Sequence, residues 1–190
     1  LLLQEHFYNE NQSYMKSATV RGLLAHTADE CDTNFFGADG PDYKYGWGLM
    51  NAKFAAETIS NNGTSSIIIE GTLNDNDVYE VDLEAIGGNN VIATLSWTDP
   101  AGTVYNSSVA NMLDYDVPVL VNDLDLRVND SQNTYFPWKL DPSSPGTPAT
   151  QGDNLVDNIE KVEINDAYGS LNFKISHKGY LTNSAQEFTL

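Results

Sequence analysis

The spacing of hydrophobic positions changes about one third of the way along the chain. Residues 16–29 and 49–59 place apolar or small side chains at the i, i+3, i+4 and i+7 spacing of one helix face. The three leucines at residues 1–3 indicate part of a further helix. The segment 33–42 is dense in Gly, Asp and Asn and is predicted to be a loop. We therefore expect residues 1–60 to be mainly helical.

After a polar, breaker-rich stretch at 61–66, which is predicted to be a linker, the hydrophobic period becomes two. The predicted strands are 67–70, 78–83, 91–97, 124–128, 162–164, 171–176 and 187–190. Clusters of turn-forming residues at 74–77, 87–90 and 99–102 are predicted to separate strands. Many short strands with no helical stretch between them favour an antiparallel β-sandwich or jelly roll over a parallel sheet. The predicted fold class is therefore mixed, with a helical segment at 1–62 followed by an all-β domain at 63–190.

The charge balance excludes some partners. Asp and Glu number 27 against 9 Lys and Arg, which gives a net charge of −18. Such a surface repels nucleic acid and anionic membranes, so we expect neither as a partner. No apolar run reaches the roughly 18 residues that a membrane span needs, so no membrane span is expected. The single cysteine, Cys31, has no partner for an internal disulfide and is predicted to be structural.

Two acidic stretches stand out in the β region, at 121–126 and 152–160. Asp123 and Asp125 project from the same face of a predicted strand, where their like charges repel unless a positive group lies between them. The second stretch adds further carboxylate and amide oxygens, which are the ligands that Ca²⁺ prefers. The candidate calcium ligands are Asp123, Asp125, Asp153, Asn154, Asp157 and Glu160. The alternative is that these Asp and Asn residues form Asx turns and solvated strand ends.

A glycine-bracketed turn leads into the second predicted helix of the N-terminal segment. Tyr45-Gly46-Trp47-Gly48-Leu49-Met50-Asn51-Ala52 suggests a tight turn with close backbone approach. Together with the helices before it, this motif resembles the C-terminal end of a subtilisin-like serine protease catalytic domain, over residues 1–60. The Asp, His and Ser of that family belong to sequence upstream of such a segment, so the resemblance places no catalytic residue in this chain. None of His6, His26 and His177 has a nucleophile setting beside it in the sequence.

The β region carries a second resemblance, over residues 67–190. The stretches 96–100, 120–126, 135–138 and 153–160 look like the C-terminal jelly-roll β-sandwich that follows the catalytic domain in one group of subtilases. This resemblance implies bound calcium. It also implies a secreted, extracellular or periplasmic serine endopeptidase, a hydrolase of the peptidase S8 family that acts in proteolysis on polypeptide substrates. The fragment itself would be inactive, and its partner would be the catalytic domain of the same polypeptide. The helical apolar faces would pack against the sandwich or a neighbouring chain, or would be poorly ordered.

The alternative function is a non-catalytic extracellular module that binds carbohydrate or protein. Trp97, Tyr135, Phe136 and Trp138 are candidates for a sugar-stacking platform, but core filling and packing between domains are the favoured explanation for these aromatic residues. The helical residues 1–60 favour the protease fragment, because a free-standing binding module does not require them.

Overall fold

The computed structural model describes residues 1–31, 39–103 and 117–190, and the predicted loop at 33–42 lies mostly outside these ranges. The fold is mainly β, with 39% strand and 19% helix. The helices are α1 (Leu2–Asn11), α2 (Ser17–His26) and α3 (Ala52–Ser60), with a short 3₁₀ helix, η1 (Thr182–Ser184), near the C-terminus. The strands are β1 (Glu70–Asn74), β2 (Tyr79–Trp97), β3 (Leu124–Asn129), β4 (Thr134–Tyr135), β5 (Trp138–Lys139), β6 (Thr150–Gln151), β7 (Ile159–His177) and β8 (Ala185–Thr189).

The helices form where the apolar spacing predicts them. The Asn51 side chain caps α3, because its Oδ1 accepts a hydrogen bond from the Phe54 N–H at 2.9 Å. The predicted glycine turn precedes this cap, with Gly46 at φ 63° and Gly48 at φ 104°. A Cβ on Gly48 would lie 2.2 Å from the Asp29 carbonyl oxygen, so the expected close backbone approach is confirmed.

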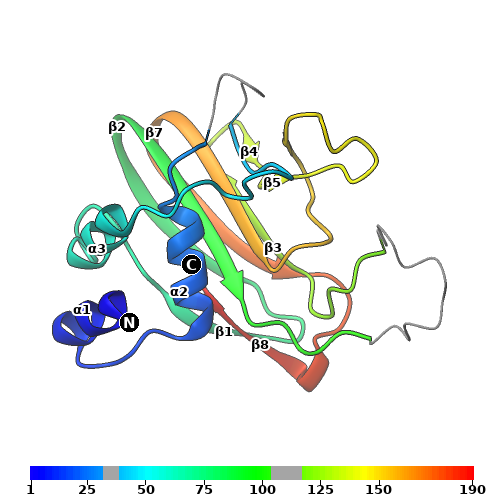
Figure 1. Ribbon diagram of the computed structural model, residues 1–190, viewed down its shortest axis with the longest axis horizontal. Helices are drawn as coiled ribbons and strands as arrows, with labels where there is room; N and C mark the ends of the chain where they lie inside the picture. Colours follow the sequence, from blue (N-terminus) through cyan, green and yellow to red (C-terminus); the bar gives the residue numbers. More distant parts are fainter. Residues whose placement is uncertain (32–38, 104–116) are drawn as a thin grey trace.

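One antiparallel sheet has the strand order β1-β8-β2-β7-β3-β4, and β5 pairs separately with β6 (Figure 1). The two longest strands, β2 and β7, have 19 residues each and pair with one another along most of their length. In the six-stranded sheet, β8 and β3 flank this central pair, and β1 and β4 form the edges. The strand predicted at 67–70 begins only at Glu70, the last of those residues.

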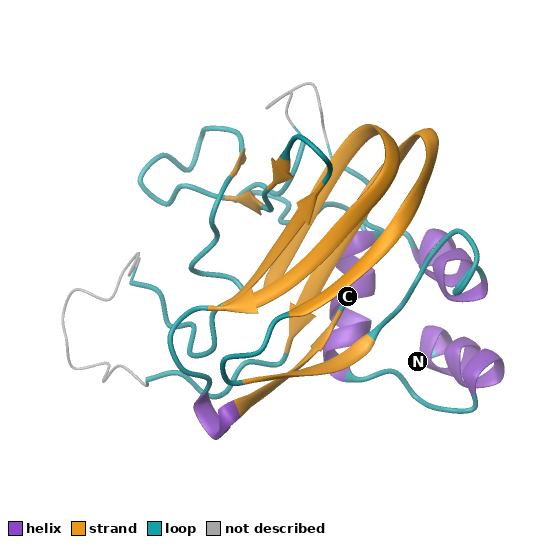
Figure 2. Cartoon of the chain, turned by 180° about the vertical axis from the view of Figure 1, so that it is seen from behind, coloured by secondary structure: helices purple, strands orange, loops and turns teal. Residues whose placement is uncertain are grey.

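The central pair bends part-way along, which corrects one expectation from the sequence. The cluster at 87–90 was expected to separate two strands, but it lies within β2, where the pairing with β7 shifts register between Ala85 and Val91. Likewise, 162–164 and 171–176 are halves of the single strand β7. Gly88 and Gly169 have φ angles of 78° and 73°, as residues in bulges often do. The two strands arch over together and return (Figure 2).

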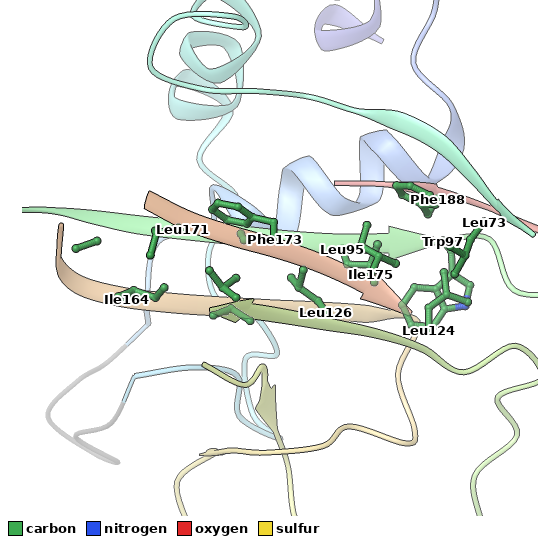
Figure 3. Packing of buried hydrophobic residues seen from close by; sticks show 14 of the residues in the cluster. Leu73, Leu95, Trp97, Leu124, Leu126, Ile164, Leu171, Phe173, Ile175 and Phe188 are labelled. Atoms are coloured by element: carbon green, nitrogen blue, oxygen red, sulfur yellow. The ribbon is translucent and has the colours of Figure 1, made fainter. Parts of the chain in front are cut away.

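The bend makes the two halves of the sheet enclose one core. Leu126, Phe173 and Ile175 come from one half, Leu95 and Val162 from the other, and all belong to a single buried cluster (Figure 3). Trp97 and Phe188 close the end of this cluster and are fully buried. The arrangement is consistent with a β-sandwich, in which two sheet faces share one apolar core.

Helix α2 covers the outer face of β2 near its C-terminal end. Residues 93–97 are all buried, because alternate side chains enter the core while those between them face the helix. The Ser96 hydroxyl donates to the Ala18 carbonyl at 2.9 Å, and Thr94 Oγ1 lies 3.0 Å from His26 Nδ1. A Cβ on Gly22 would lie 2.9 Å from the Ser96 Cβ, so glycine permits this close approach.

A second, smaller core joins the helices to one another. It consists of Phe7, Met15, Leu23, Ala55 and Ile59. This cluster does not bury the apolar helix faces completely, since the Phe54 side chain is 41% exposed. Helix α2 lies against the β domain, while Leu23 packs among the helices and Phe54 stays partly exposed, so the expected partner of the helical apolar faces stays a prediction. The proposed domain boundary near residue 62 stays a prediction.

The contact between Gly22 and Ser96 predicts a stability effect. Gly22→Leu adds atoms where the helix and strand touch, so the free energy of unfolding should fall by about 1–3 kcal/mol, as for other overpacked sites. Urea denaturation measures this change. The control is Lys53→Leu, which adds the same side chain at an exposed position of α3. Equal stability of the two variants would mean that α2 does not lie this close to β2.

Candidate functional site

The acidic residues predicted from the sequence gather at one end of β3. Asp123 immediately precedes β3, Asp125 lies within it, and β7 pairs beside it so that Asp125 is opposite Ser176. Glu160 lies near the start of β7, and Asp153 lies in the loop after β6. We call these four residues, Asp123, Asp125, Asp153 and Glu160, the acidic cluster. Two cations lie among them, Arg127 from β3 and Lys178 from just beyond β7.

Lys178 contacts three of the four carboxylates. Its Nζ lies 2.6 Å from Asp125 Oδ1, 3.0 Å from Asp153 Oδ1 and 3.3 Å from Asp123 Oδ2. Partial burial disfavours the ammonium, but the hydrogen bonds to Asp125 and Asp153 outweigh burial and raise the pKa of Lys178. The ammonium is therefore firmly held as the central counter-charge of the cluster.

Arg127 joins the remaining carboxylate to this network. Its Nη2 donates to Asp125 Oδ1 at 2.8 Å and also to Asp153, while Nη1 lies 3.7 Å from Glu160 Oε2. The guanidinium also lies over the Phe136 ring, 4.8 Å from its centre. Burial raises the pKa of Asp125 despite these cations. For Asp153, burial is outweighed by the hydrogen bond from Lys178, which lowers the pKa.

Glu160 is the most buried member of the cluster. Its side chain is fully buried, and its Oε2 accepts from the Leu126 N–H at 2.5 Å. Its Oε1 is buried without a hydrogen-bond partner, as is Asp123 Oδ1. Burial raises the pKa of Glu160 to about 8, and it also raises the pKa of Asp123. When the two carboxyl groups are ionised, these buried oxygens are acceptors that a cation or a water molecule would satisfy.

The other two predicted ligands serve a local turn. Asn154 Oδ1 accepts from the Val156 N–H at 3.0 Å and from the Asp157 N–H at 3.2 Å. Asn154 Nδ2 donates to Asp157 Oδ2 at 3.0 Å. These contacts form the Asx turn that the sequence offered as the alternative to a calcium ligand. The structure therefore brings four of the six predicted ligands together and gives Asn154 and Asp157 a turn of their own.

The donor set of the cluster is compatible with a hard cation, since it consists of carboxylate oxygens and two of them lack partners. In the ranges that the structure describes, no three His, Cys, Asp or Glu side chains already stand in metal-binding geometry. The Lys178 ammonium lies among three of the carboxylates instead. Calcium thus stays a prediction, with Asp123, Asp125, Asp153 and Glu160 as the residues that would hold it.

The histidines and the aromatic residues have structural contacts. His26 is hydrogen-bonded to the Thr94 hydroxyl, and His177 Nε2 accepts a hydrogen bond from the Asn76 N–H. His6 Nε2 lies 2.8 Å from Ser60 Oγ at an exposed position. Trp97 is fully buried and its indole donates to the Asn122 carbonyl at 2.9 Å, so it is a core residue and not part of a sugar platform.

No model of a known protein family matches this sequence, and no curated protein matches it significantly. Within the described residues, none of the helices is both long enough and apolar enough to cross a membrane.

The buried Glu160 predicts a pH dependence of stability. Its pKa is about 8 in the folded chain and ordinarily 4.5, so between these values the folded state binds a proton that the unfolded state lacks. The stability that Glu160 contributes is complete below pH 4.5 and is lost as the pH rises toward 8, by at most about 1.4 kcal/mol per pH unit. Glu160→Gln should flatten this slope in urea denaturation between pH 5.5 and 7.5. The exposed Glu84→Gln is the control, and identical slopes for all three proteins would contradict the buried acid.

The position of Lys178 predicts how calcium acts. Calcium should raise the unfolding temperature, and a free concentration of about 100 times the Kd should add about 2.7 kcal/mol of stability. Lys178→Met removes the ammonium that competes for the carboxylates, so it should lower stability in a chelator and enlarge the gain on adding calcium. Lys174→Met, at a more remote position on β7, serves as the control. Calorimetric melts that are the same in excess calcium and in chelator, for every variant, would exclude the site.

Proposed function

We propose that this chain is the C-terminal part of a secreted subtilisin-like serine endopeptidase. In this proposal the β domain is a jelly-roll sandwich that braces the catalytic domain and holds calcium at the acidic cluster, and the chain alone has no proteolytic activity. The observation that carries the proposal is the contrast between two sides of the helical segment. One side is fixed to the sheet by polar contacts, and large apolar side chains elsewhere on the described part of the segment are exposed.

The fixed side is a network between α2 and strands β1, β2 and β8. Arg21 donates to the Trp97 carbonyl, and the Lys16 N–H donates to Glu70 Oε1 at 2.8 Å. Lys16 Nζ also forms an ion pair with Glu187 at 2.8 Å. Several such contacts in one interface hold the helix in one orientation more firmly than one exposed ion pair does. This rigid attachment is what a bracing domain requires.

The exposed apolar residues of the helical segment support the proposal that a further domain packs against it. Leu2 is 79% exposed, Leu49 is 66% exposed and Met50 is 59% exposed, all within the helical segment. Contiguous exposed apolar patches mark surfaces that pack against another protein part, and Leu49 and Met50 are adjacent in the sequence. Leu49 and Met50 belong to the motif that resembles the end of the subtilisin catalytic domain, where they would contact the rest of that domain.

The decisive experiment is to express this chain together with the coding sequence that precedes it. The longer protein should cleave casein and should be labelled covalently by a fluorophosphonate probe, while residues 1–190 alone should show neither reaction. A catalytic domain produced without residues 67–190 should inactivate at a lower temperature than the whole protein. Absence of fluorophosphonate labelling in the folded longer protein would exclude the protease, and a glycan-binding screen with Trp138→Ala as control would then test the carbohydrate-binding alternative.

A further inference from the structure

We propose that a cavity between the helical segment and the bent sheet binds a small uncharged apolar molecule. This cavity, which we call the seam cavity, is lined by parts of α2, α3, the segment 64–69, both sides of the bend in β2, and β7. The inference does not depend on the protease proposal, because it uses only residues of this chain.

The size of the seam cavity suits a ligand. Its volume is about 480 Å³, and it is partly open to solvent. Ligand sites are commonly about 300–1,000 Å³. The volume of the seam cavity therefore lies within the range of sites for small molecules.

The walls of the seam cavity are mainly hydrocarbon. Leu23 from α2 and Phe54 from α3 lie on the helical side, and Ile68 lies in the segment that follows. Leu83 and Phe173 come from the sheet. Because these side chains cannot pair with a charge, a ligand that fills the space gains mainly from the burial of apolar surface.

The ionisable groups of the lining favour an uncharged ligand. Among the described residues, the lining contains no Lys or Arg, and its one acidic side chain, Glu84, is exposed to solvent. Leu190 also lines the cavity, and in the chain 1–190 it carries the terminal carboxylate, which adds no positive charge to the walls. Burial lowers the pKa of His26 to about 4, with Lys161 acting in the same direction and Glu163 against it, so the ring is neutral at pH 7. A carboxylate ligand would lose its hydration in the cavity and would find no positive counter-charge among the lining residues.

A few polar groups can orient one polar end of the ligand. Thr19, Thr58, Ser66 and Asn61 contribute hydroxyl and amide groups to the walls. The three hydroxyls already donate hydrogen bonds within the protein, Thr19 to Glu70, Thr58 to the Phe54 carbonyl at 2.9 Å and Ser66 to the Thr58 carbonyl at 2.7 Å. Each hydroxyl oxygen can still accept a hydrogen bond from a ligand. This balance suits a molecule with a long hydrocarbon part and a single hydroxyl or carbonyl group, such as a medium-chain alcohol.

The test uses the uncharged fluorescent probe N-phenyl-1-naphthylamine with the chain 1–190. The probe should bind saturably at one site, and 1-dodecanol should displace it at least tenfold more effectively than dodecanoate. Ala85→Phe places a ring in the cavity wall and should weaken binding at least tenfold. Ala101→Phe adds the same ring at an exposed position outside the lining and should leave the affinity unchanged.

Circular dichroism and the unfolding temperature establish that both variants fold. If Ala85→Phe does not fold, methyl NMR of the unchanged chain replaces it, and the probe should shift the resonances of Leu23 and Leu83. Unsaturable binding, equal affinity in a folded Ala85→Phe, or shifts confined to other methyl groups would overturn the proposal. Any of these results would indicate that the cavity is filled by apolar side chains of another polypeptide segment and not by a small molecule.

Discussion

The coupled bend in β2 and β7 is the constraint on which the rest of the structure depends. Each strand has 19 residues, and neither can turn alone without breaking the hydrogen bonds to its neighbour. Both strands therefore bulge at the same level, and the single sheet folds over its own apolar face. The core around Leu95 and Phe173, the outer face that receives α2, and the seam cavity beside the bend all result from this geometry.

Much of the fold is accessible from the sequence because its signals are local. The helices α2 and α3 and the strand β3 lie where the hydrophobic period predicts them. The bend was missed because glycine and asparagine at 87–90 suit a reversing turn and a bulge equally well. Only the paired strand distinguishes the two, and its residues, near Gly169, lie about 80 positions away in the sequence.

In the candidate site, too, features with a local sequence signal were predicted and a feature that depends on strand pairing was missed. The common face of Asp123 and Asp125 follows from strand alternation, and their meeting with Asp153 and Glu160 agrees with the grouping expected from residue type. Arg127 and Lys178 were missed. Arg127 had a local signal, since it lies two residues beyond Asp125 on the same strand. Lys178 had none, because its position depends on the register between β3 and β7.

The paired bulges also limit how the gene for this protein can change. A residue inserted into one long strand beyond the bend would move every following side chain to the opposite face, so core leucines would face α2 or solvent. A matching insertion in the other strand would restore the pairing. Lengths near 85–91 and 164–169 are therefore expected to vary together among descendants of this sequence, as a correlated pair of insertions or deletions separated by a long stretch of the coding sequence.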